Sequence, residues 1–349
     1  MTSMKSKFLF FCLLCITPLA YSQLGGEVTY PFLRIPTSAR MAGLGGAPAS
    51  IIDNDVNLAI ANPALLSDTM NLAIALNYSP YLVGTKNSFF GFAKSWKGVG
   101  NFLLGINYLS YGTFDGFDEF GTQSGTFTGH DMAIYMQYSR RLSPSFSSGI
   151  TIKPIFTEYE SYSSSALATD IAFNYNNLSR LFSAGIILRN YGRQFSNYGN
   201  NKTESFTPDL AISVSQKLKH APLRFLLTAQ NLTKWDLTYN VVDKGNSSAI
   251  SIQEPTTYSF GNKLLRHVVI GVEIIPTRNI YVDISYNGRI QQELKYETSS
   301  TFAGFAFGFG FRVKQFQFGY AIQQYHSSSS AHFFSISTNF GRFAFAQRK

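Results

Sequence analysis

The chain of 349 residues has only two cysteines, Cys12 and Cys15, and both lie near its start. Charged residues are also scarce, at 14% of the chain, against roughly 25% in soluble domains. No long apolar run follows residue 22, so no transmembrane helix is expected, since such a helix needs about 18 apolar residues. These shortages exclude a disulfide framework and a helical membrane anchor, and they disfavour an ordinary soluble domain.

The amino terminus has the parts of a secretory signal peptide. Lys5 and Lys7 precede the apolar run 8–19, and small residues at Ala20 and Ser22 suit a cleavage site. We therefore expect a signal peptide over residues 1–22, whose removal takes both cysteines with it. Export makes nucleic acid an implausible partner, whereas a net charge of +9 is compatible with anionic lipopolysaccharide.

Aromatic residues are abundant, at 15% of the chain, and many alternate with small or polar residues. In FAFGFGFRVKQFQFGY (305–320) the alternation changes parity at Lys314 and Gln315. Alternation predicts strands, and a two-residue turn at the change keeps the aromatic side chains on one face of a hairpin. The side chains that we predict to face lipid are Phe305, Phe307, Phe309, Phe311, Phe316 and Phe318.

Fourteen segments have alternation or strand-like composition, and most have the length of a tilted membrane strand, about 9–11 residues. They are 71–79, 86–96, 99–112, 128–141, 146–158, 166–176, 180–190, 206–218, 222–232, 265–275, 279–289, 301–313, 315–325 and 331–340. The connections are alternately long and short, as in outer-membrane barrels, whose short turns face the periplasm. The sequence predicts an all-β fold, a 14-stranded antiparallel transmembrane β-barrel over 71–349.

Aromatic residues near predicted strand ends indicate a belt at the membrane interface, with ordinary interior aromatics as the alternative. The predicted belt residues are Trp96, Tyr108, Trp235 and Tyr286. Positions that alternation assigns to the lumen are small or polar, which argues against an apolar channel. They are Asn71, Ala73, Gln137, Asp283, Ser285, Gly308, Arg312, Gln317 and Gln323.

Residues 23–70 lack clean periodicity and are punctuated by glycine and proline. The segment is too apolar for a solvated tail, so we expect a plug inside the lumen with short helices. Asp53-Asn54-Asp55-Val56-Asn57 looks like a fragment of a calcium loop, but it lacks the glycine and the closing glutamate. A turn or a plug contact is the simpler interpretation, and we predict no metal and no cofactor.

The plug segment also resembles a known family. The stretches YPFLRIP (30–36), SARMAGLGG (38–46) and ANPALL (61–66) are similar to the PorV/PorQ group, outer-membrane proteins of the type IX secretion system, and the likeness to PorQ is the closer. The motif residues are Ser38, Ala39, Arg40, Asn62, Pro63 and Ala64. The resemblance implies a barrel similar in fold to the fatty-acid transporter FadL.

The resemblance further implies a role without enzymatic activity. PorQ-like proteins hold a surface subunit, PorZ, in an attachment complex with PorV and the sortase-like PorU, which joins secreted cargo to anionic lipopolysaccharide. On this interpretation the outer loops, above all 113–127 and 233–264, dock a PorZ-like partner, unless they bury their own aromatic residues over the barrel mouth. The residues named for this contact are Phe114, Phe117, Phe120, Trp235, Tyr239, Tyr258 and Phe260.

No sequence signature of an enzyme is apparent. The five histidines form no H-E-x-x-H pattern, and neither G-x-S-x-G nor a P-loop is present. Asp115, Asp118, Glu119 and His130 are close in sequence, but a solvated acidic loop explains them better than a catalytic site. We predict no catalytic residues, and the alternative function is FadL-like transport of hydrophobic small molecules.

Overall fold

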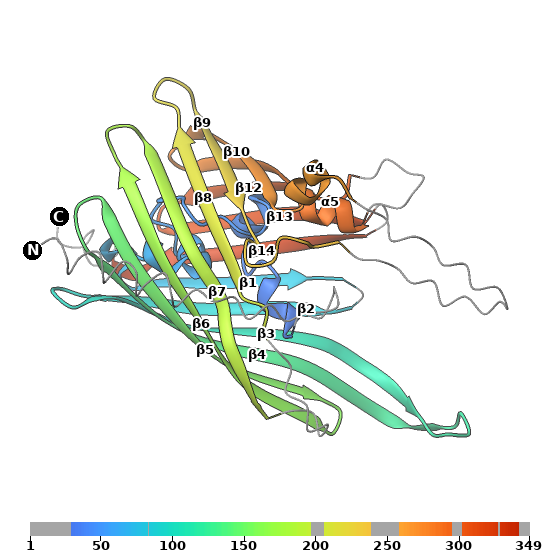
Figure 1. Ribbon diagram of the computed structural model, residues 1–349. Helices are drawn as coiled ribbons and strands as arrows, with labels where there is room; N and C mark the ends of the chain where they lie inside the picture. The colour runs from blue at the N-terminus through green and yellow to red at the C-terminus, as the bar shows by residue number, and fades with distance from the viewer. Residues whose placement is uncertain are drawn as a thin grey trace, which may run out of the picture. The chain divides into compact units, whose positions relative to one another are not determined.

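Fourteen antiparallel strands form one closed barrel in the computed structural model (Figure 1). The structure describes residues 29–82, 84–196, 206–238, 258–294, 302–326 and 329–341, so the predicted signal peptide lies outside it. Each strand pairs with its neighbour in sequence, and β1 (Ala73–Pro80) closes the barrel by pairing with β14 (Ser329–Asn339). Closure gives every strand partners on both sides. The predicted fold class is confirmed.

The remaining strands follow the predicted segments, with shifts at their ends. They are β2 (Lys86–Trp96), β3 (Gly100–Phe117), β4 (Gln123–Arg141), β5 (Phe146–Tyr159), β6 (Tyr162–Asn177), β7 (Phe182–Ser196), β8 (Asp209–Lys217), β9 (Leu223–Ala229), β10 (Val268–Thr277), β11 (Ile280–Asn287), β12 (Phe305–Val313) and β13 (Phe316–His326).

Large apolar side chains cover the outside of the barrel. In β12, Phe307, Phe309 and Phe311 are 47%, 44% and 38% exposed, while the residues between them are buried inside. The pattern continues into β13 through a turn at Lys314, which has a left-handed φ of 54°, and Phe311 lies opposite Phe318. An apolar band around a closed barrel is the architecture of bacterial outer-membrane proteins, because lipid contacts the outer face.

The inward face is less polar than predicted. Gln137, Asp283, Ser285, Gln317 and Gln323 are buried inside, in agreement with the alternation. However, apolar residues of β2 to β5 also point inward and pack against the start of the chain. This inner apolar patch consists of Phe89, Leu103, Leu109, Ala133, Tyr135 and Ile155. The lumen is therefore mixed in polarity, which weakens the sequence argument against an apolar channel.

Two regions predicted as long loops are mostly strands. β3 and β4 continue to Phe117 and from Gln123, so 113–127 is a hairpin that extends past β1 and β2 (Figure 1). The predicted loop 159–165 reduces to a tight turn in which Glu160 has a φ of 56°. Residues 123–128 are exposed on both faces. Away from lipid neither face must be apolar, so these strands carry no alternation in the sequence.

Residues 29–70, which we call the plug, form short helices inside the barrel. These are η1 (Pro31–Arg34), α2 (Ala39–Gly43), α3 (Val56–Ala61), η2 (Pro63–Leu65) and η3 (Asp68–Met70). α2 packs against β12 to β14, and η2 packs against β4 to β6. The contact is so close that a Cβ at Gly149 in β5 would lie 2.4 Å from the Pro63 carbonyl carbon. Any larger residue at position 149 would collide with η2, so the glycine allows η2 to pack against β5.

Two more helices lie in the long connections. α4 (Phe260–Leu265) precedes β10, and α5 (Gly288–Leu294) follows β11, where the predicted strand 279–289 runs two residues too far. Within the described ranges, no helix combines the length and hydrophobicity of a membrane span.

Candidate functional site

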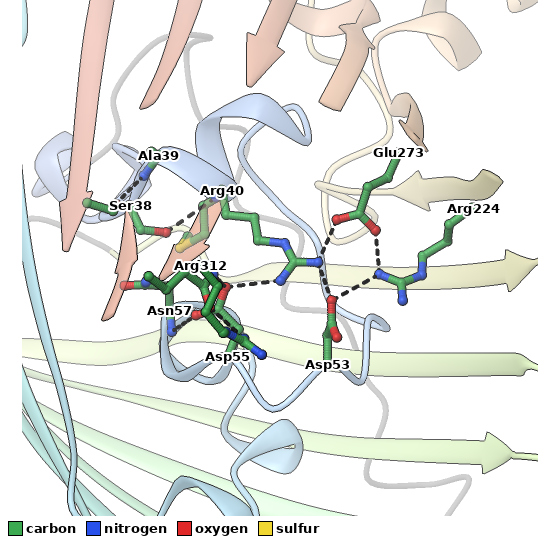
Figure 2. A network of polar contacts seen from close by, with 12 residues as sticks. Ser38, Ala39, Arg40, Asp53, Asp55, Asn57, Arg224, Glu273 and Arg312 are labelled. Carbon is green, nitrogen blue, oxygen red and sulfur yellow. Dashed lines mark hydrogen bonds and ion pairs between the residues drawn. The ribbon is translucent and has the colours of Figure 1, made fainter. Parts of the chain in front are cut away.

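Arg40, one of the amino-terminal motif residues, is held at the start of α2. Ser38 caps the helix, because its hydroxyl accepts a hydrogen bond from the backbone N–H of Met41 at 3.3 Å. The backbone N–H of Ala39 donates to Ser335 Oγ in β14 at 2.8 Å. These bonds fix the first turn of α2 against the wall, and the Arg40 side chain extends from it towards Glu273 in β10 (Figure 2).

Five charged side chains then form one ion-pair network, which we call the latch: Arg40, Asp53, Asp55, Arg224 and Glu273 (Figure 2). Arg40 Nη1 donates to Asp55 Oδ2 at 3.0 Å, and Arg40 Nη2 donates to Glu273 Oε1 at 2.5 Å and also to Asp53. Arg224 in β9 donates to Glu273 and lies 3.5 Å from Asp53 Oδ2. The latch therefore joins the plug to the wall twice, through Arg40 with Glu273 and through Asp53 with Arg224.

Most of the latch is removed from water. The side chains of Arg40, Asp55 and Glu273 are 3%, 0% and 1% exposed. Desolvation offsets much of the attraction within such a network, whereas loss of one member leaves the others as uncompensated buried charges. The Arg40 guanidinium also lies 4.5 Å from the centre of the Tyr281 ring, which adds a cation–π contact. The latch thus fixes where the plug sits more than it adds net stability.

Asp53 is the latch member with most access to water, at 39% of its side chain. Burial raises its pKa, but the positive charges of Arg40 and Arg224 outweigh burial and hold the pKa of this carboxyl below its usual value. Asp53 is therefore ionised at neutral pH and available to both guanidinium groups.

Asn62, Pro63 and Ala64 fasten the second half of the plug. Asn62 Oδ1 accepts from the backbone N–H of Ala64 at 2.9 Å, and Asn62 Nδ2 donates to the carbonyl of Ala49 at 2.5 Å. The Ala64 carbonyl accepts from Ser147 Oγ in β5 at 2.7 Å. Pro63 starts η2, where no backbone donor is needed. Five of the six motif residues therefore cap the plug helices or hold them in place, and Pro63 starts η2.

Sequence reasoning missed Arg224 and Glu273, the wall members of the latch. The available signal was a single acidic residue at an inward position of an otherwise apolar strand, VVIGVEII (268–275). Asp53 and Asp55 were interpreted as a turn or plug contact, and both do contact Arg40. Asp55 also caps α3 by accepting from the backbone N–H of Asn57 at 3.0 Å.

Residues 114–127, which we call the outer hairpin, carry three of the aromatic residues predicted for a partner. Phe114 and Phe127 lie opposite each other and stack, with ring centres 5.4 Å apart. Phe117 is 63% exposed, and Phe120 at the tip is 85% exposed. Asp118 orders the tip by accepting from the backbone N–H groups of Phe120 and Thr122. Asp118 therefore stabilises the turn, and the side chain of Phe120 is exposed to solvent at the tip.

The second predicted partner region is only partly described. Trp235 stacks on His267, with ring centres 5.1 Å apart, and lies 5.5 Å from Phe260. The Tyr258 ring is 5.1 Å from the Arg266 guanidinium. These side chains contact one another, but Trp235 is 44% exposed and Phe260 is 69% exposed, so the described part of this region does not bury them. Tyr239 lies outside the described residues.

Of the predicted belt residues, Trp96 and Tyr286 lie at strand ends, whereas Tyr108 lies in the middle of β3 because this strand continues to Phe117. Trp96 beside a short turn is 52% exposed, and Tyr108 is 39% exposed and stacks on His130. The Tyr286 ring lies 5.1 Å from that of Phe305. Their positions suit an interface, and their contact with lipid stays a prediction, as it does for the outward phenylalanines of β12 and β13.

Neither protein-family models nor curated proteins match the chain. Among solved structures, the toluene transporter TodX of Pseudomonas putida matches with a TM-score of 0.51 and 10% identity, over 90% of this chain and 98% of that chain. The TodX monoaromatic hydrocarbon channel deltaS2 mutant matches with a TM-score of 0.50 and 10% identity, over 87% of this chain and 97% of that chain. A Pseudomonas aeruginosa FadL homologue matches with a TM-score of 0.47 and 10% identity, over 87% of this chain and 98% of that chain.

At this identity the similarity defines the fold alone. The chain has a FadL-like, 14-stranded barrel of the outer-membrane type, with a short helical segment before the first strand. The comparisons give no support to the type IX assignment, which rests on the amino-terminal motif.

Proposed function

We propose that this chain is a non-enzymatic outer-membrane barrel that holds a protein partner at the cell surface. The observation that carries the proposal is the outer hairpin, which extends past β1 and β2 and presents Phe117 and Phe120 to water. Exposed aromatic residues of this kind form the cores of protein interfaces, and a partner that covers them removes a costly apolar surface. The latch supports this role, because it keeps the barrel plugged and rigid beneath the hairpin.

The resemblance of the amino-terminal motif suggests who the partner is. On this proposal the barrel is a PorQ-like component of the type IX secretion system and anchors a PorZ-like surface subunit, in a complex with PorU and PorV. The net positive charge of the chain suits a setting in anionic lipopolysaccharide.

The test is purification from native membranes. The tagged full chain is extracted in mild detergent, as wild type, as Phe117→Ser/Phe120→Ser and as Phe146→Ser. Phe146 is the matched control, since it is 51% exposed but lies at a short turn. We expect a large surface protein with the wild type and the control, and a yield at least about tenfold lower with the hairpin variant, as for interface hot spots. Equal yields from all three would contradict the proposal.

A second candidate is a channel for hydrophobic small molecules, and the fold comparison favours it over the first, since the TodX structures are named as a transporter and a hydrocarbon channel. The inner apolar patch supports it, because Leu103, Leu109 and Ile155 give the wall an apolar inner face beneath the plug. Under this candidate the purified barrel carries apolar molecules that solvent extraction recovers, and Leu109→Gln loses them. A barrel that carries none would count against it.

A further inference from the structure

A cavity of about 430 Å³ lies at the short-turn end of the barrel. It is lined by residues of β8 to β13, by the turn 278–279 and by the plug residues Arg40, Asp53 and Asn54. Short turns of outer-membrane barrels face the periplasm, so the cavity is on that side. Its volume is within the range of small-ligand sites, about 300–1,000 Å³.

The cavity is strongly basic. The charged side chains that line it are Arg40, Lys217, Arg224, Arg278, Arg312 and a single carboxylate, Asp53. Arg40 and Arg224 are paired within the latch. In the part of the chain that the structure describes, Lys217, Arg278 and Arg312 form no ion pair, and Arg312 Nη2 donates to the neutral Gln317 at 2.8 Å. Three cations therefore remain for an incoming negative charge.

Asp53 already shows how an anion is held there. Its carboxylate lies between the guanidinium groups of Arg40 and Arg224 and keeps 39% of its side chain exposed. It is carried by the plug beside two exposed residues, Ile52 and Asn54, rather than by the wall. Arg40 would keep Asp55 and Glu273 if Asp53 left, and Arg224 would keep Glu273. Asp53 is thus the latch member that another anion can replace at the lowest cost.

We propose that this cavity binds an anion carrying a carboxylate or phosphate group, and that the bound anion replaces Asp53 between Arg40 and Arg224. Both groups accept paired hydrogen bonds from guanidinium. Lys217, Arg278 and Arg312 attract the ligand from the periplasmic side. Replacement breaks the Asp53–Arg224 contact, one of the two links between plug and wall. Ligand binding in the cavity therefore weakens the attachment of the plug. The site does not depend on what the outer hairpin binds.

The ligand has two possible sources, a small free anion or the carboxyl terminus of a periplasmic chain, and calorimetry on the full protein in detergent separates them. The probes are inorganic phosphate, trialanine and trialanine amide. Binding of phosphate supports a small anion, and binding of trialanine without phosphate supports a chain terminus. Binding of neither, or equal binding of the amide, would overturn the proposal.

Three variants and one control test the residues. Arg278→Gln and Arg312→Gln should each weaken binding about tenfold, since hydrogen bonds to charged groups are worth about that factor or more. Arg180→Gln, an exposed arginine at the turn between β6 and β7, should change nothing. Asp53→Asn should strengthen binding about tenfold because it removes the internal competitor. If Asp53→Asn binds the ligand with unchanged or weaker affinity, the ligand does not replace Asp53. If Arg278→Gln binds the ligand as well as Arg180→Gln does, the cavity is not the binding site.

Discussion

Replacement of Arg40 by glutamine tests whether the latch seats the plug. The substitution leaves Asp55, 0% exposed, without the cation that it pairs with, whereas Glu273, 1% exposed, loses one cation and keeps Arg224. Loss of one partner from a buried ion pair costs about 3–5 kcal/mol. Because each 1.4 kcal/mol is a factor of ten, the population with an unseated plug should rise by roughly two to three and a half orders of magnitude. The strand pairing of the barrel should survive, since Arg40 lies outside it.

The assay is limited chymotrypsin digestion in detergent, with cleavage within residues 29–70 followed by mass spectrometry. Arg180→Gln is the control, because it also removes one positive charge but at an exposed turn. Asp55→Asn added to Arg40→Gln should restore part of the protection, since it removes the buried charge that Arg40 neutralises in the wild type. If Arg40→Gln and Arg180→Gln are cleaved at the same rate, the latch does not hold the plug and the reasoning fails.

Three further predictions concern the plug, the lipid face and pH. Gly149→Ala should loosen the plug by about 1–3 kcal/mol in the same digestion, because its Cβ would meet Pro63 at 2.4 Å, whereas Gly261→Ala has open space and should not. Phe309→Lys should cost about 2–4 kcal/mol in urea titrations of the protein in phospholipid vesicles, and a comparable cost for Phe120→Lys would contradict the assignment of faces. The pKa of Asp53 is lowered in the folded protein. The stabilisation that ionised Asp53 gives to the seated plug is therefore complete above the ordinary carboxyl pKa, about 4. It is lost as the pH falls through the lowered pKa of the folded protein. Cleavage of the plug should therefore increase at acid pH, and the increase should be smaller in Asp53→Asn; an identical pH profile would exclude Asp53 as a cause.

The membrane made the barrel predictable from sequence. Lipid on one side and lumen on the other impose alternation, so β2 was predicted at its observed bounds, 86–96, and the turn at Lys314 between β12 and β13 was found from a change of parity. Where β3 and β4 extend past β1 and β2, both of their faces are exposed, so that constraint ends and the prediction failed over 113–127. The strand order needed no further information, because consecutive antiparallel strands that close on themselves have one arrangement.

Only the plug side of the latch was predictable from the sequence. The family resemblance marked Arg40 as a motif residue, and Asp53 was expected to make a turn or a plug contact. Glu273 is 233 positions from Arg40, and only barrel closure brings the two together across the lumen. Alternation gives the face on which a side chain lies but not its partner there. The inner apolar patch was missed for a related reason, since inward positions such as Phe89 and Leu103 differ from outward ones only through the three-dimensional fold.

The most direct test of the surface role is photo-crosslinking in intact cells. A photoreactive phenylalanine analogue is placed at Phe120, on the tip of the outer hairpin, and at Phe146, at a short turn. The account predicts a crosslink from position 120 to a large surface protein, and none to that protein from position 146. No crosslink at 120, together with apolar small molecules recovered from the purified barrel, would contradict it and favour a channel.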